Sequence, residues 1–128
     1  MAGRAGDAAR RTAKQAAGDA GEAMARSMLE RAGLEFVAAN VRAKGGELDL
    51  VMRDGQTLVF VEVRQRAAGR FGGAADSVTA AKRRRVALAA QHYLSRFGDR
   101  PPPCRIDVVA IDMGEGREPR LHWMRDAF

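Results

Sequence analysis

The chain has 128 residues, which is enough for one domain with its own hydrophobic core and too few for two. Its 22 Lys and Arg residues outnumber its 16 Asp and Glu residues, which gives a formal net charge of +6. This excess favours nucleic acid over a membrane as partner, because no apolar run is long enough to cross a bilayer. The single cysteine, Cys104, excludes a disulfide framework and a Cys-rich zinc site, and it suits the cytoplasm, where we expect the protein.

The N-terminal part of the chain predicts a tail followed by a helix. Residues 1–18 are rich in Ala, Gly, Arg and Lys without an apolar stripe, so we expect a flexible basic tail and then a single domain over residues 19–128. The first helix is predicted over residues 19–32, and Glu22 lies at the edge of its apolar face. Asp19 and Glu22 also have the spacing of a capping box, so the pattern is equally consistent with a purely structural Glu22.

Three strands are predicted next, over residues 34–41, 47–52 and 57–64. The Asp54-Gly55 pair between the second and the third strand is a strong signal for a hairpin with a two-residue loop. The second and third strands are therefore expected to be antiparallel neighbours in one sheet.

The predicted hairpin decides which acidic side chains share a face of the sheet. With Asp54 and Gly55 as the loop, Asp49 faces Phe60 and Glu47 faces Glu62. Asp49 and Glu62 are then diagonal neighbours, with roughly 7–8 Å between their backbones. Charged groups at the centre of a sheet are costly unless a metal, a counter-charge or hydrogen bonds compensate them. The acidic cluster is therefore a candidate for divalent-metal chemistry.

The rest of the chain predicts a crossover. Residues 67–76 contain three glycines and are expected to form a mobile loop, and a helix follows over about residues 77–97. A strand is predicted over residues 105–112, so the order strand, helix, strand indicates a parallel connection. Residues 121–124 allow one more strand at the edge. The expected fold is α/β, with a central mixed sheet flanked by helices in the order α-β-β-β-α-β.

The acidic residues suggest a role in phosphate chemistry. Mg²⁺ and Mn²⁺ prefer oxygen ligands, and Mg²⁺ retains several waters, so Asp49 and Glu62 would suffice as protein ligands. The ion would polarise a phosphoryl oxygen and lower the pKa of a bound water. Glu22 would assist from the helix, and Arg64 or Lys82 would stabilise charge on the phosphate. The alternative is a salt bridge between Arg64 and one of the strand acids on a solvated face.

Basic side chains surround the predicted site. Residues 82–85 form either a phosphate-contacting face or a solvated helix surface, and the pattern favours neither. Arginine contacts to phosphate position a duplex without reading its sequence, so structure-selective binding is expected. The candidate nucleic-acid-binding residues are Arg42, Arg66, Arg70, Lys82, Arg83 and Arg84.

Short motifs follow one another between about residues 18 and 112: Gly21-Glu22, Asn40-x-Arg42, GELDL (46–50), VFVEVRQR (59–66), Arg70-Phe71-Gly72, Val78-Thr79 with Lys82, and RIDVV (105–109). In this order they resemble the YraN-like family, small bacterial proteins of the restriction-endonuclease-like superfamily that are similar to archaeal Holliday junction resolvases. The resemblance implies a restriction-endonuclease-like fold with a PD-(D/E)xK-type nuclease site. Glu22 would match the acid of the first helix, Asp49 the metal-binding aspartate and Glu62 the acid of the (D/E)xK element.

Position 64 departs from this pattern, because Arg64 stands where the nuclease motif has Lys. Arginine is effectively always protonated and cannot act as a base, but it can hold a phosphate bidentately. We therefore expect an endonuclease for branched or structured DNA that uses Glu22, Asp49, Glu62 and Arg64, with Mg²⁺ or Mn²⁺ on Asp49 and Glu62. The alternatives are a catalytically inactive nucleic-acid-binding module of the same fold and an adaptor for another protein. Junction-resolving relatives act as dimers, which allows a homodimer.

Overall fold

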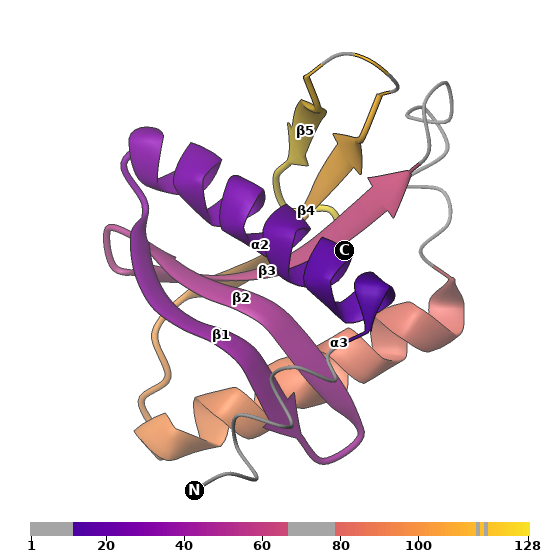
Figure 1. Ribbon diagram of the computed structural model, residues 1–128. Coiled ribbons are helices and arrows are strands. Elements are labelled where there is room, and N and C mark those ends of the chain that lie inside the picture. The colour runs from indigo at the N-terminus through magenta and orange to yellow at the C-terminus, as the bar shows by residue number, and fades with distance from the viewer. Residues whose placement is uncertain (1–11, 67–78, 115, 117) are drawn as a thin grey trace, which may run out of the picture.

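The computed structural model describes residues 12–66, 79–114, 116 and 118–128 (Figure 1). A five-stranded mixed sheet with the order β1-β2-β3-β4-β5 forms its centre, and a helix packs on each face. This α/β architecture confirms the predicted fold class, including the extra strand at the edge. The elements in chain order are α2 (Ala13–Arg31), β1 (Glu35–Ala43), β2 (Gly46–Asp54), β3 (Thr57–Arg66), α3 (Ala80–Leu94), the 3-10 helix η2 (Ser95–Phe97), β4 (Cys104–Asp112) and β5 (Arg120–Met124).

The first helix, α2, begins at Ala13 and not near Asp19 as the sequence predicted. Thr12 caps it: the Thr12 hydroxyl accepts the Gln15 N–H at 3.0 Å, and Gln15 Oε1 accepts the Thr12 N–H at 2.9 Å. This reciprocal pair is a capping box, which satisfies two backbone donors at the helix start. Asp19 and Glu22 therefore lie inside the helix, and the interpretation of these two residues as its cap is wrong.

The earlier start of α2 also revises the predicted tail. Residues 13–18, which the sequence assigned to the tail, are helical, whereas residues 1–11 lie outside the described part of the chain. The other end of the helix agrees with expectation. Gly33 has a φ of 101°, a left-handed conformation that glycine adopts without strain, and its N–H donates to the Glu30 carbonyl at 3.0 Å.

The β2–β3 hairpin is present, but its turn lies one residue later than predicted. Asp54 pairs with Thr57, so Gly55 and Gln56 are the two loop residues. Gly55 has a φ of 61°, which is the conformation that such a tight turn requires.

This later turn changes the predicted pairing of the acidic residues. Leu50 pairs with Val61, and continuing the register places Asp49 opposite Glu62 and not opposite Phe60. The predicted pairing of Glu47 with Glu62 is wrong for the same reason. Because the register moves by two positions, each side chain keeps its face of the sheet. Asp49 and Glu62 are therefore closer partners than the predicted diagonal neighbours.

Apolar side chains build one core on each face of the sheet. Ala25 and Leu29 of α2 pack on one face, and the rings of Tyr93 from α3 and Phe60 meet edge to face on the other, with centroids 5.7 Å apart. Both faces are thus covered, so a charged side chain on either face needs compensation. The sheet residues on the α2 side are Leu50, Met52, Val59, Val61, Val109 and Ile111, and those on the α3 side include Val51, Leu58 and Phe60.

The second half of the domain completes the sheet. β3 and β4 are parallel and joined through α3, as the order of elements predicted, and β5 pairs antiparallel with β4 at the edge. The predicted loop over residues 67–76 lies outside the described residues. The chain then returns to the sheet, where the Ala127 N–H donates to the Ile106 carbonyl at 2.8 Å and Phe128 packs against the α3-side core. No helix in the described part of the chain is long and apolar enough to cross a membrane.

Candidate functional site

Asp49 of β2 and Glu62 of β3 are two acidic side chains that the sheet brings together. The strand register places them opposite each other, and both face α3. The Val63 N–H donates to Oδ2 of Asp49 at 2.9 Å. Glu62 is almost completely buried, with 2% of its surface exposed. The pair therefore lies between the sheet and α3 and not on a solvated surface.

The closeness of the two carboxylates changes the acidity of Asp49. Burial raises the pKa of Asp49 to about 7, and the negative charge of Glu62 acts in the same direction. The hydrogen bond from Val63 and the charge of Lys82 lower this pKa without cancelling the rise. Burial and the charge of Glu62 thus favour the protonated form of Asp49, and a nearby cation would favour its ionised form.

Two cationic side chains already approach Glu62. Lys82 Nζ lies 3.1 Å and Arg64 Nη1 lies 3.6 Å from the same oxygen, Oε1. Lys82 stands in the first turn of α3, where the helix dipole disfavours a positive charge, and Glu62 offsets that cost. The alternative of a salt bridge to Arg64 is thus present for Glu62, but the bridge is buried and not on a solvated face.

Glu22 approaches this pair from the other helix. It lines a separate cavity of about 310 Å³ between α2 and the start of the sheet, together with Asn40 of β1. Burial raises the pKa of Glu22, the charges of Asp49 and Glu47 raise it further, and a hydrogen bond with Asn40 lowers it. Glu22 therefore senses the charge of Asp49, although the two side chains line different cavities.

The donor set suits a hard divalent cation that keeps most of its water. Among the described residues, no group of three or more His, Cys, Asp or Glu side chains is arranged to hold a metal ion. Asp49 and Glu62 offer two neighbouring carboxylates. Mg²⁺ is commonly coordinated by only one or two carboxylates of a protein, and water fills its other positions. The residues fit Mg²⁺ or Mn²⁺ as a largely hydrated ion, with Glu22 outside direct contact.

A cavity of about 500 Å³ opens beside Asp49 and has basic walls. Arg42 from β1 and Lys82 from α3 line it, as does Arg85, which belongs to the predicted basic segment 82–85 but is not among the candidate binding residues named from the sequence. Arg85 is three residues after Lys82, and residues at this spacing share one side of a helix, so helical spacing was the signal that identifies it. Arg85 is exposed and makes no ion pair with another described residue, which leaves its charge available to a ligand.

The remaining predicted nucleic-acid-binding residues lie elsewhere. Arg83 and Arg84 are exposed on α3 but do not line the cavity, and Arg83 stacks over the Phe128 ring at 5.4 Å. The side chain of Arg66 and the whole of Arg70 lie outside the described part of the structure. The structure thus brings only part of the predicted basic group to the acidic pair.

The cavity has its shape because the β1–β2 turn rests directly on α3. A Cβ atom at Gly46 would collide with the backbone carbonyl of Arg85, so only glycine fits at this contact. This close approach holds the hairpin that carries Arg42 against the helix that carries Lys82 and Arg85. The two basic walls are therefore positioned by backbone packing.

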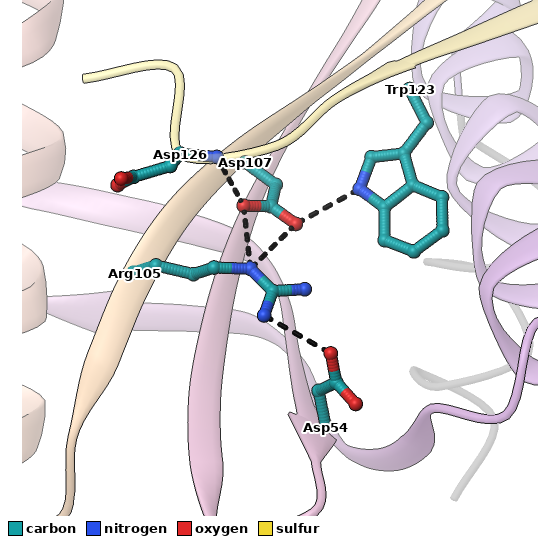
Figure 2. A network of polar contacts seen from close by, with 5 residues as sticks. All are labelled: Asp54, Arg105, Asp107, Trp123 and Asp126. Atoms are coloured by element: carbon teal, nitrogen blue, oxygen red, sulfur yellow. Dashed lines mark hydrogen bonds and ion pairs between the residues drawn. The ribbon is translucent and has the colours of Figure 1, made fainter.

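A second polar cluster lies on the other face of the sheet, the α2 side, where Asp107 alternates with Val109 and Ile111 (Figure 2). Asp107 of β4 is fully buried, and Arg105 Nε donates to both of its carboxylate oxygens at 3.1 and 3.2 Å. The Trp123 Nε1–H and the Asp126 backbone N–H donate to the same carboxylate at 2.9 and 2.8 Å. Arg105 also donates to Asp54 in the β2–β3 turn at 3.0 Å. The cluster joins β4, β5 and the hairpin turn, and every oxygen of Asp107 has a donor.

The order of helices and strands, the mixed sheet and the paired acids on its second and third strands define a restriction-endonuclease-like α/β protein. The model of the uncharacterised protein family UPF0102 matches residues 21–111. The chain belongs to this family, which confirms the predicted YraN-like membership.

Similar proteins cover nearly the whole chain. A UPF0102 protein of Cupriavidus pinatubonensis is 58% identical over 116 residues, which is 89% of this chain and 86% of the relative. A UPF0102 protein of Xanthomonas campestris pv. campestris is 56% identical over 91% of this chain and 93% of its own length. A third, from Janthinobacterium sp., is 51% identical over 91% of this chain and 90% of its own length. The names of these relatives carry the family and no activity.

Proposed function

We propose that this protein is a divalent-metal-dependent endonuclease that hydrolyses phosphodiester bonds in DNA. The observation that carries the proposal is the Asp49–Glu62 pair, two adjacent carboxylates next to a cavity with basic walls. Paired acids supply ligands for a cation, and basic walls supply contacts for a polyanion. The presence of both features in one site supports the proposed phosphodiester hydrolysis.

Each side chain has a distinct role in this proposal. Asp49 and Glu62 hold the ion, which when bound supplies a Lewis acid and an activated water. Arg64 stays protonated and stabilises negative charge on the phosphate, since it cannot accept a proton. Lys82, in contact with Glu62, provides a second cation at the same phosphate. Glu22 accepts hydrogen bonds from water at the edge of the site.

The cavity favours the DNA backbone over the bases as the part that is recognised. Of the described residues that line it, none is aromatic, so it offers no surface for base stacking, whereas Arg42, Lys82 and Arg85 can each contact a phosphate. Backbone contacts do not read sequence, and the proposed substrate is therefore branched or otherwise structured DNA. The proposed location is the cytoplasm.

The test compares cleavage of labelled junction, flap and linear DNA by the wild type and by Asp49→Asn, with Mg²⁺ or Mn²⁺. We expect cleavage by the wild type and its loss in Asp49→Asn, because the variant removes one of two carboxylate ligands with little change in shape. Asp99→Asn is the matched control, since Asp99 is exposed and away from the cavity. Cleavage by Asp49→Asn at the wild-type rate would eliminate the proposed site.

One observation favours a second candidate, an inactive DNA-binding module of the same fold. Lys82 already neutralises Glu62 at 3.1 Å, and Arg64 replaces the lysine of the nuclease motif. For such a module we expect salt-dependent DNA binding without cleavage and no calorimetric signal with millimolar Mn²⁺.

The proposal also allows a homodimer. Light scattering during the same experiments tests this, because a dimer has twice the 13.8 kDa mass of one chain.

A further inference from the structure

Asn40 has an unusual backbone conformation in the middle of β1. Its φ is 52°, which is left-handed, and apart from Asp126 it is the only described non-glycine residue with a positive φ. The register continues on both sides of it, since Ala39 pairs with Leu50 and Val41 pairs with Leu48. The conformation is therefore not the result of an inserted residue. The left-handed conformation is sterically unfavourable for L-residues, and Asn tolerates it better than most.

The position of Asn40 links the two sides of the candidate site. The register on either side places it opposite Asp49 on the neighbouring strand. Its side chain nevertheless lines the 310 Å³ cavity together with Glu22 from α2, and it lowers the pKa of the Glu22 carboxyl group. One residue thus lies next to the strand of the acidic pair and contacts the acid contributed by the helix.

Glu22 needs such a partner because its other neighbours are acidic. Asp49 and Glu47 both act on it with negative charge. A carboxamide N–H donor that faces the carboxylate favours its ionised form and fixes its direction. Backbone strain at a residue that contacts a candidate catalytic acid is typical of functional sites.

We infer that Asn40 is a positioning residue, whose left-handed backbone directs its carboxamide to Glu22 and holds that carboxylate towards the Asp49–Glu62 pair. The inference rests on the proposed function, because it assigns Asn40 a role in the same site. It acts through Glu22 and touches neither the ion nor the phosphate. The other interpretation is that Asn40 only shapes the strand, in which case a residue suited to the same backbone replaces it fully.

Glycine separates these two roles, because it adopts a positive φ freely but has no carboxamide. We expect Asn40→Gly to keep the thermal unfolding midpoint of the wild type and to weaken Mn²⁺ binding and DNA cleavage by about tenfold, the lower end of the effect of residues outside the ligand shell of a metal. Asn40→Ala loses the carboxamide and the tolerated backbone together, so its unfolding midpoint also falls. Ala39→Gly controls for added backbone freedom at a neighbouring exposed position.

A double-mutant cycle with Glu22→Gln tests whether Asn40 acts through Glu22. Mn²⁺ affinity from calorimetry and single-turnover cleavage are measured for both single variants and for the pair. We expect Asn40→Gly to have no further effect in the Glu22→Gln background, because its target carboxylate is then absent. Equal losses in both backgrounds would overturn the inference, as would wild-type Mn²⁺ affinity and cleavage in Asn40→Gly.

The outcomes separate this inference from the proposed function. If Asp49→Asn abolishes Mn²⁺ binding and cleavage while Asn40→Gly matches the wild type, the proposed function stands and the role of Asn40 is wrong. If the wild type neither binds Mn²⁺ nor cleaves DNA, the proposed function fails and the positioning role fails with it.

Discussion

Two carboxylates of the described part of the sheet, Asp107 and Asp49, are compensated in opposite ways. Asp107 receives hydrogen bonds from Arg105, Trp123 and the Asp126 backbone, all formed when the chain folds. Asp49 instead lies against a second acid and has one backbone donor, and burial raises its pKa to about 7. The first carboxylate is thus satisfied by hydrogen bonds within the protein, whereas the second is left with a raised pKa. Burial by itself therefore does not distinguish the two carboxylates, whereas the number of their hydrogen-bond donors does.

The largest expected effect is on the satisfied cluster. Asp107→Ala should lower the free energy of unfolding by about 3–5 kcal/mol, because it leaves the half-buried Arg105 without its main partner and removes the acceptor of Trp123. Urea denaturation followed by the fluorescence of the single tryptophan, Trp123, measures this loss at the affected site itself. Asp99→Ala, at an exposed position, is the control. A loss no larger than that of the control would mean that the Asp107 network contributes little to stability.

The opposite effect on the free energy of unfolding is expected at Asp49, because loss of its charge should stabilise the fold. Asp49 has a pKa of about 7 in the fold against an ordinary 3.8, so the folded protein holds this proton more tightly than the unfolded chain. For this group, stability is therefore greatest below pH 3.8, falls as the pH rises to about 7, and is constant above that.

Asp49→Asn should remove this pH dependence and raise the free energy of unfolding at pH 8 by about 2 kcal/mol, because it removes the strained charge. Denaturation of both proteins at pH 5 and at pH 8 measures the effect, and the difference between them should shrink at the lower pH. A variant that is less stable than the wild type at pH 8 would contradict the contrast between the two carboxylate groups.

A divalent ion should stabilise the folded protein only when the Asp49–Glu62 pair is intact. Mn²⁺ at ten times its dissociation constant should raise the free energy of unfolding of the wild type by about 1.4 kcal/mol through binding to the folded state. Asp49→Asn should show no such gain, and Asp107→Ala should keep it if the variant is folded. Thermal unfolding with and without Mn²⁺ gives all three values. Equal stabilisation of wild type and Asp49→Asn would place the ion elsewhere.

The smallest effect concerns the basic walls. Arg85→Ala should weaken DNA binding similarly for all sequences and reduce the slope of log affinity against log salt by about one, the loss of one phosphate contact. Arg84→Ala, on the same helix but outside the cavity, should change the slope less. Fluorescence anisotropy over a range of salt concentrations makes the comparison. Identical slopes for the two variants would show that the cavity is not where the backbone binds.

Much of the site was predictable because strand alternation is robust to error. The predicted turn was one residue too early, yet Asp49 and Glu62 remained on one face, since a shift of the register by two positions preserves side-chain parity. The pairing of opposite acids was not predictable, because it depends on the exact loop. The start of α2 had a readable signal, as Thr12 and Gln15 have the spacing of a capping box.

Other features depended on contacts between distant parts of the chain. Arg105 and Asp107 are two residues apart, but their partners come from the β2–β3 turn and from β5. The left-handed backbone of Asn40 has only a weak local signal, the tolerance of Asn for this conformation, because the position lies inside a strand. Such features follow from tertiary packing, which overrides local preference.

The contact between Gly46 and the Arg85 carbonyl has a consequence for selectivity. Main chain touching main chain acts as a fixed spacer, so the gap between the two arginine-bearing walls does not widen when their side chains change rotamer. Substitutions along those walls would then change the affinity for a nucleic-acid strand, while the width of the cavity would stay constant. If the cavity binds nucleic acid, its selectivity for shape would therefore be set by the contact between the β1–β2 turn and α3, and it would change only when that turn is changed.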